Sequence, residues 1–186
     1  MSTNDHLGGC YKCGDANTIM PDIWGWLMVE YNIQSVLDVG CGYGHALSWF
    51  ENFPIHCVGV DGYIDAINDK VCRTNIIQHD YTLGNLDYNH NFDLCWCAEF
   101  LEHVEEKYLN FIFDSFLKCK YVCITHAHPD QIGYHHVNCQ NDEYWIEKFK
   151  EHNFSFDKKI SDKLRLSNRW NAGWGRNSLM FFYKNI

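Results

Sequence analysis

The chain has 186 residues, a formal net charge of −9 and an apolar fraction of 46%. This length is typical of a single domain, and the composition excludes disordered and collagen-like chains. No run of about 18 apolar residues encodes a membrane span, the N-terminus lacks the pattern of a secretory signal, and the acidic balance argues against extended nucleic-acid binding.

Short β-rich runs alternate with helical segments along the chain. The expected helices are 20–33, 44–52, 63–70, 99–119 and 142–153. The expected strands are 35–40, 56–61, 75–80, 92–97, 121–127, 154–160 and 178–184, with a polar, aromatic loop at 161–177. Strands that are apolar on both faces and alternate with helices predict a parallel sheet with helices on both sides, which is a doubly wound α/β fold. We expect one domain over 1–186, with residues 1–34 as an N-terminal lid and helix.

Ten cysteines are scattered through apolar runs such as HCVGV and LCWC, where cysteine packs as a small apolar side chain. In a chain without a secretory signal they indicate free thiols and a reducing, cytoplasmic location. Cys10 and Cys13 have the spacing of zinc ligands, but no second pair of this kind follows, so a structural zinc site is not favoured.

A glycine-rich turn follows the first expected strand and precedes a helix. Its sequence is Gly40-Cys41-Gly42-Tyr43-Gly44, in which glycines permit a tight turn and a close approach of backbone to ligand. The spacing is GxGxG, which differs from the GxGxxG of nicotinamide-binding folds. Asp38 precedes the turn, and Asp61 ends the second strand, where a carboxylate can accept both hydroxyls of a ribose. Asp80 ends the third strand, where it or Tyr81 would meet an adenine ring.

Four segments occur in the order typical of one family: VLDVGCGYG, VGVDG, QHD and FDLCWCAEFLEHV. Over about residues 35–105 the chain resembles the class I S-adenosylmethionine-dependent methyltransferases. The resemblance implies S-adenosylmethionine as cofactor and a Rossmann-like seven-stranded mixed sheet of order 3-2-1-4-5-7-6, with helices on both faces. It also implies that the glycine turn lies under the methionine part, that Asp61 holds the ribose and that Asp80 faces the adenine. The residues expected to contact the cofactor are Asp38, Gly40, Cys41, Gly42, Gly44, Asp61, Gly62, Asp80, Tyr81 and Cys97.

Carboxylates and histidines gather after the fourth and fifth expected strands. Glu99 and Glu102 lie three positions apart and His103 follows. The run HAHPDQIGYHH supplies further histidines after the fifth strand, whose end neighbours that of the fourth in this fold. Oxygen and imidazole ligands together suit Mg, Mn, Fe or Zn. The expected ligands of a divalent metal, which would lower the pKa of an acceptor hydroxyl, are Glu99, Glu102, His103 and His136.

The ExxEH segment followed by a later histidine is similar to two metal-assisted branches, the small-RNA 3′-terminal 2′-O-methyltransferases and the ubiquinone-pathway O-methyltransferases. A like segment is common in class I methyltransferases that use no metal, where it orders the loop. The chain also departs from the small-RNA branch, which has a Pro-Asn loop where HAHPDQ stands here. Without a metal, the candidates for a catalytic base are His103, His126 and His128.

The residues after the fourth expected strand bear on the chemistry of the acceptor. Residues 97–100 read Cys-Ala-Glu-Phe and lack the Asn/Asp-Pro-Pro-Tyr/Phe motif of N-methylation. We expect O-methylation of a small molecule, such as a sugar or glycan hydroxyl, which Trp170, Trp174 and Arg176 would contact. Two alternatives stay open. One is an RNA 2′-O-methyltransferase, and the other is a cofactor-binding subunit without activity of its own.

Overall fold

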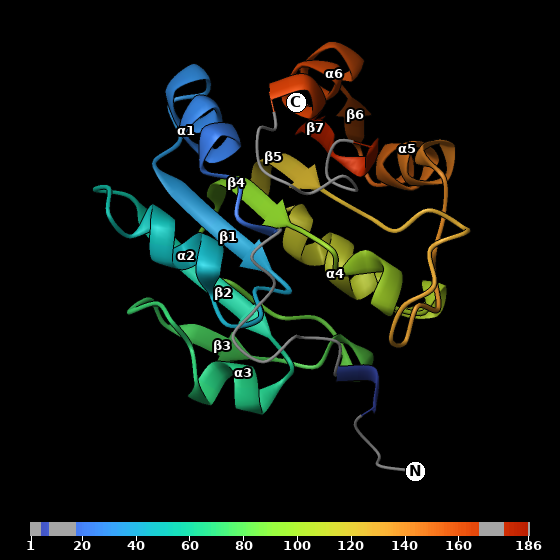
Figure 1. Cartoon of the computed structure of the whole chain (residues 1–186), viewed down its shortest axis with the longest axis horizontal. Coiled ribbons are helices and arrows are strands. Elements are labelled where there is room, and N and C mark those ends of the chain that lie inside the picture. Colours follow the sequence, from blue (N-terminus) through green and yellow to red (C-terminus); the bar gives the residue numbers. More distant parts are fainter. Residues whose placement is uncertain (1–4, 8–17, 168–176, 186) are drawn as a thin grey trace.

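The computed structural model describes residues 5–7, 18–167 and 177–185. Seven strands form one sheet in the order β3-β2-β1-β4-β5-β7-β6 (Figure 1). Parallel pairs join β3, β2, β1, β4 and β5, whereas β7 pairs antiparallel with β5 and with β6. The strands are β1 (Ser35–Val39), β2 (His56–Asp61), β3 (Ile76–Gln78), β4 (Phe92–Cys97), β5 (Cys119–Ile124), β6 (Phe154–Phe156) and β7 (Met180–Lys184). The predicted fold class and strand order are confirmed.

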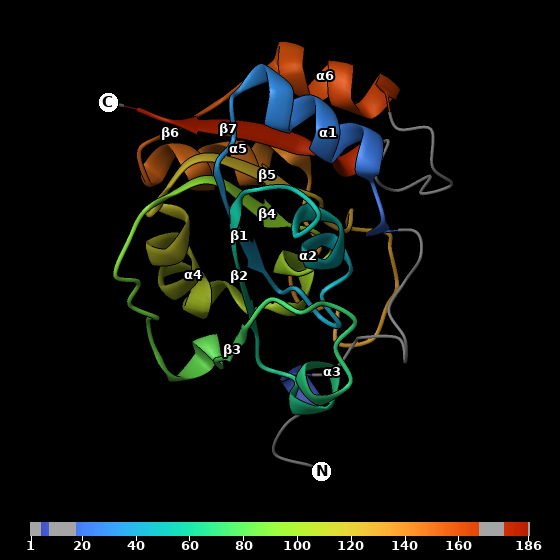
Figure 2. The same ribbon diagram turned by 90° about the vertical axis from the view of Figure 1, so that its left-hand side faces the viewer.

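Helices cover both faces of the sheet, as Figure 2 shows for α2 and α4 on opposite sides of the strands. They are α1 (Pro21–Glu30), α2 (His45–Phe50), α3 (Ile64–Asn68), α4 (Leu109–Phe116), α5 (Asp142–Glu151) and α6 (Lys158–Ser167). Short 3-10 turns are η1 (Asp5–Leu7), η3 (Tyr81–Leu83), η4 (Leu101–His103) and η5 (Glu106–Tyr108). No helix in these described ranges is long and apolar enough to cross a membrane.

Two apolar cores hold the helices against the sheet. On one face Trp24 of α1 and Phe50 of α2 pack with Leu164 of α6. On the other face Phe113 of α4 packs with Phe149 of α5, their ring centroids 4.9 Å apart. Each of these side chains is at most 1% exposed, so burial of apolar surface is the main force that orders the layers.

The predicted helix over 99–119 is wrong in extent. Glu99 has a left-handed φ of 50° and Val104 is extended, so the segment forms η4 and η5 before α4 begins at Leu109. Cys119 already belongs to β5. The break leaves Glu99, Glu102 and His103 on an irregular segment at the carboxyl edge of the sheet.

The predicted strand over 154–160 is also too long. It ends at Phe156, and the side chain of Asp157 accepts a hydrogen bond from the backbone N–H of Ile160, 2.9 Å away, at the start of α6. The expected loop at 161–177 is therefore helical to Ser167. Trp170, Trp174 and Arg176 lie outside the described residues, as do Cys10 and Cys13.

The described cysteines are all free thiols, and five of them are buried. Cys95 and Cys97 lie on β4, Cys119 and Cys123 lie on β5, and Cys72 packs beside α2. Their place in the sheet agrees with the prediction that they serve as small apolar side chains.

Candidate active site

The glycine turn joins β1 to α2 at the carboxyl edge of the sheet. Gly40, Gly42 and Gly44 have φ values of 72°, 52° and 79°, which L-residues adopt only with strain. A Cβ atom on Gly40 would stand 2.3 Å from the ring of Phe100, so this turn also has no room for a side chain. The backbone N–H groups of Gly40 and Cys41 donate to the carbonyl oxygen of Val60, which fixes the turn to β2.

Asp61 locks the turn to the end of β2. One carboxylate oxygen accepts from the backbone N–H of Gly42 at 2.7 Å, and the other accepts from Tyr63 at 2.8 Å. Burial raises the pKa of Asp61 in spite of these hydrogen bonds. Each oxygen has a further lone pair, so the carboxylate can still accept hydroxyl groups.

Asp38 lies behind the turn with 3% of its surface exposed. Burial, and then the negative charge of Asp61, raise the pKa of Asp38 to about 8. Neither acid forms an ion pair with a lysine or arginine in the part of the chain that the structure describes. Two buried acids without a cation fit a cofactor that carries positive charge, as the sulfonium and ammonium groups of S-adenosylmethionine do.

Asp80 follows β3 and is bound on both oxygens. Oδ1 accepts from the backbone N–H of Thr82 at 2.8 Å, and Oδ2 lies 3.0 Å from Nε2 of His6. Burial alone would raise the pKa of Asp80, but the hydrogen bonds from His6 and Thr82 lower it. Two other expected contacts face the core. The Tyr81 hydroxyl bonds Ser115 Oγ at 2.8 Å, and Cys97 has no exposed surface.

The structure brings three of the four expected metal ligands into one cluster. Ligand atoms of Glu102, His103 and His136 lie within 4.8 Å of one another. The fourth, Glu99, is not in this group, but it acts on Glu102 electrostatically: burial raises the pKa of Glu102, and the negative charge of Glu99 raises it further. Burial, and then His136, lower the pKa of His103 to about 4, so this imidazole is neutral at neutral pH.

Several atoms of this cluster are buried without a hydrogen-bond partner. They are Glu99 Oε1, both carboxylate oxygens of Glu102 and Nδ1 of His103. Buried polar atoms are normally paired, and an unpaired one is costly. A site with free oxygen and nitrogen lone pairs directed into one small volume fits a divalent cation.

The histidines beyond β5 differ from one another in access. His126 is 0% exposed, and its Nε2 lies 3.1 Å from Oδ1 of Asp142, whose other oxygen accepts from Arg165 at 2.7 Å. His128 is partly exposed, with its ring centroid 5.0 Å from that of His126. His126 therefore does not reach an acceptor in this conformation, whereas His128 has an open surface.

Sequence reasoning missed Asp142, Gly133 and His6. Asp142 was recognised only as the start of a helix, although it joins His126 to Arg165 across α5 and α6. A Cβ on Gly133 would stand 2.1 Å from Nε2 of His136, and no local sequence pattern predicts this close contact. His6 contacts Asp80, 74 positions away.

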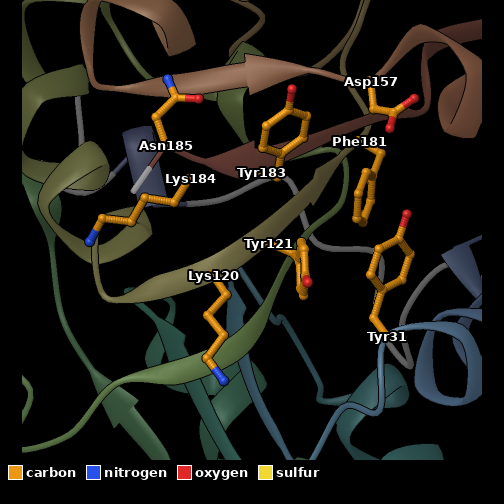
Figure 3. A pocket seen from close by; sticks show the side chains of 8 residues that line it. All are labelled: Tyr31, Lys120, Tyr121, Asp157, Phe181, Tyr183, Lys184 and Asn185. Atoms are coloured by element: carbon orange, nitrogen blue, oxygen red, sulfur yellow. The ribbon is translucent and has the colours of Figure 1, made fainter.

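A separate cavity of about 520 Å³ lies at the opposite edge of the sheet (Figure 3). Tyr31 packs there against Tyr121 and Phe181, with ring centroids 4.6 and 4.9 Å away. Lys120 points away from these rings and pairs with Asp93 at 2.6 Å. The cavity adjoins the amino end of β5, so it is remote from the strand ends that carry the candidate site.

Comparisons with known proteins agree with this geometry. Residues 37–114 match a family model described as a methyltransferase domain. A comparison with curated protein sequences finds no match. Among solved structures, the methyltransferase domain of bacterial CtHen1-C is similar, with a TM-score of 0.64, 15% identity, and coverage of 89% of this chain and 97% of that chain.

Two further solved structures share the fold. Magnesium protoporphyrin IX methyltransferase from Synechocystis PCC 6803 with bound S-adenosylhomocysteine has a TM-score of 0.64 and 12% identity, over 87% of this chain and 80% of that one. The plantazolicin methyltransferase BpumL has a TM-score of 0.62 and 14% identity, over 89% and 83%. Residues 37–114 therefore match a methyltransferase domain, and the strand order of the sheet is that of the class I S-adenosylmethionine-dependent methyltransferase fold.

Proposed function

We propose that this methyltransferase acts on a hydroxyl group of a small acceptor, such as a sugar, with a divalent cation held by Glu99, Glu102, His103 and His136. The observation that carries the proposal is the set of buried, partnerless oxygen and nitrogen atoms in this cluster. Because each of these groups binds a cation through a lone pair, their convergence is costly without a cation and favourable with one.

The orientation of His136 supports the same role. Its Nδ1 lies 2.9 Å from the carbonyl oxygen of Gln131, so Nδ1 carries the hydrogen and Nε2 keeps a free lone pair. At neutral pH the imidazole of His103 is neutral, since its pKa is about 4. The ring of His103 is therefore in the form that binds a metal. A bound cation would supply a positive charge that lowers the pKa of an acceptor hydroxyl.

The other end of the site holds the methyl donor. When bound, S-adenosylmethionine supplies an electrophilic methyl group on a sulfonium. We propose that the glycine turn at Gly40, Cys41, Gly42 and Gly44 cradles the methionine part, with Asp38 near its positive charge, and that Asp61 and Gly62 hold the ribose. Asp80 would then face the adenine. Because methyl transfer needs mainly alignment of donor and acceptor, this rigid turn contributes through positioning.

A hydroxyl acceptor must also lose a proton. Among the histidines named as catalytic candidates, we assign this role to His128, whose side chain is partly exposed at the end of β5. His126 is fully buried against Asp142, so we assign it to the support of Glu99 and the loop. Histidine is the side chain that most often accepts a proton in general acid–base catalysis.

A small acceptor agrees with the charge of the chain. A net charge of −9 repels a phosphate backbone over any wide surface, so extended binding of RNA is disfavoured. A sugar or another small hydroxyl compound requires no such surface.

The test is an assay of methyl transfer to a panel of hydroxyl acceptors, with and without a chelator and with Mg²⁺, Mn²⁺, Fe²⁺ or Zn²⁺ restored. We expect the chelator to abolish transfer and one of the cations to restore it. Glu102→Gln should reduce transfer at least about a hundredfold, since outer-shell changes alone typically cost 10–100-fold. Glu147→Gln, on the exposed face of α5, is the matched control and should leave transfer unchanged.

Three outcomes would overturn parts of the proposal. Full activity after chelation would show that the reaction needs no metal. Transfer to RNA with salt-sensitive binding would replace the small acceptor with a nucleic acid. If the chain bound S-adenosylhomocysteine but transferred no methyl group to any acceptor with any of the four cations, a cofactor-binding subunit would be favoured.

A further inference from the structure

The N-terminal turn η1 lies against two residues of the proposed cofactor site. It sits on the β3 and α3 side of the molecule, whereas α1 lies on the β7 side, as both views show (Figures 1 and 2). His6 and Leu7 of this turn contact the segments that follow β2 and β3. These contacts join parts of the chain that are far apart in sequence.

Leu7 occupies the space above Gly62. A Cβ atom on Gly62 would stand 2.5 Å from Cδ2 of Leu7 and 3.2 Å from the carbonyl oxygen of His79. Gly62 directly follows Asp61, the proposed ribose ligand. Because Gly62 has no side chain, the apolar side chain of Leu7 fills the space beside its Cα atom.

His6 reaches the second carboxylate of the same site. Its Nε2 lies 3.0 Å from Oδ2 of Asp80, and the two side chains are 28% and 18% exposed. Thr82 holds the other oxygen of Asp80 through its backbone N–H and its hydroxyl, at 2.8 and 2.7 Å. The carboxylate of Asp80 is therefore fixed in orientation from both sides.

We propose that His6 and Leu7 complete the adenosine end of the cofactor site. Leu7 supplies the apolar surface against which a purine ring packs, and His6 positions the carboxylate of Asp80 toward that ring. An apolar wall beside two oriented carboxylates matches a planar base with an amino group, joined to a sugar with two hydroxyls. This inference rests on the proposed placement of the cofactor at Asp61 and Asp80.

The experiment is titration calorimetry of the full chain with S-adenosylhomocysteine and, separately, with 5′-methylthioadenosine, which lacks the amino-acid part. We expect Leu7→Ala to weaken both ligands about tenfold, the effect of losing one apolar contact. His6→Ala should weaken both as well. Leu166→Ala is the control, because Leu166 is 88% exposed on α6 and should leave both affinities unchanged.

A second set of variants tests the contact itself. Gly62→Ala should displace Leu7 and lower both affinities to the same degree as Leu7→Ala. In the double variant the new methyl group takes the space that Leu7 has left, so the double variant should bind no more weakly than either single variant. Additive losses would show that Leu7 and Gly62 act independently, which contradicts the proposal.

The outcomes separate this inference from the function on which it rests. If the wild-type chain binds neither ligand, the cofactor placement is wrong and the inference falls with it. If the wild type binds and the variants bind equally well or more tightly, only the role of His6 and Leu7 is wrong. If the variants lost affinity for S-adenosylhomocysteine but not for 5′-methylthioadenosine, His6 and Leu7 would contact the amino-acid part of the ligand and not its adenosine.

Discussion

The Nδ1 atom of His136 lies 2.9 Å from the backbone carbonyl oxygen of Gln131, within the loop that follows β5. A carbonyl oxygen only accepts, so this contact sets the tautomer of the imidazole and leaves Nε2 as its free lone pair. Gly133 also lies close to this ring, where a Cβ atom would stand 2.1 Å from Nε2. One loop thus sets both the protonation and the access of a proposed metal ligand.

Gly133→Ala should weaken the metal site without a change in any ligand. The added methyl group would stand 2.1 Å from Nε2 of His136, so the ring must turn away. We expect the affinity for Mn²⁺, measured by calorimetry, to fall at least about tenfold. Gly25→Ala is the control, because a Cβ there meets Trp49 only at 3.8 Å. Equal affinities of Gly133→Ala and the wild type would show that Nε2 is not a ligand.

Asp38→Asn should stabilise the cofactor-free protein and weaken cofactor binding. The pKa of Asp38 is raised from 3.8 to about 8, so the folded chain retains a proton that the unfolded chain releases. Stability is therefore lost as pH rises from about 4 to about 8, and the loss is complete above that range. The variant should lack this loss, with a gain on the order of 1–4 kcal/mol at pH 7.

Urea unfolding at pH 5 and pH 8, with exposed Asp87→Asn as control, measures this effect. Calorimetry with S-adenosylmethionine above pH 8, where the Asp38 carboxyl is ionised, should show weaker binding by Asp38→Asn, because the amide cannot carry a negative charge. A variant that has the same pH dependence of unfolding as the wild type would contradict the assigned pKa.

Gly40→Ala and Gly84→Ala separate backbone strain from cofactor binding. Both glycines have positive φ, 72° and 134°, so each substitution should cost about 1–3 kcal/mol of stability. Only at Gly40 would the new Cβ meet a neighbour, the ring of Phe100, at 2.3 Å. We expect Gly40→Ala to lose S-adenosylhomocysteine binding and Gly84→Ala to keep it. Loss of binding in both variants would attribute the effect to general destabilisation.

Asp142→Asn should destabilise the protein more than the loss of a surface ion pair does. The Asp142 carboxylate joins His126, which is fully buried, to Arg165 of α6, so the substitution removes the charged partner of both side chains. We expect a loss of about 1–3 kcal/mol in urea unfolding. Asp162→Asn removes the exposed pair with Lys158 and should cost about 0.5 kcal/mol or less. Similar losses in the two variants would mean that the His126–Asp142–Arg165 contacts contribute little.

The first half of the sheet could be predicted because its signals are local. Runs such as 56–61 and 92–97 are mainly apolar, and the observed β2 and β4 have these same bounds. The glycine turn is equally local, since positive φ values favour glycine wherever they occur. The order of the strands came from the resemblance, because pairing between distant strands leaves no local pattern.

The second half of the site could be predicted only as a set of residue types. Glu102, His103 and His136 were expected together, and the cluster exists. The contacts that orient its members, such as those of His136 with Gln131 and of His126 with Asp142, depend on loop conformation. The helix start at Lys158 was missed because the alternating pattern of FSFDKKI is that of a strand until Asp157 caps a helix.

Glu99, where φ is 50°, separates the residues proposed to bind the cofactor from those proposed to act on the acceptor. The two groups follow one another in the sequence. Every residue that the proposed function assigns to the cofactor precedes Glu99, between Asp38 and Asp80, and every residue proposed to act on the acceptor lies at or beyond Glu99. Point mutations and insertions in the loop between β5 and α5 can therefore alter the choice of acceptor while donor binding is inherited intact. One ancestral donor site could in this way serve enzymes with unrelated acceptors, and exchange of residues 127–141 between relatives is the natural way to redirect this one.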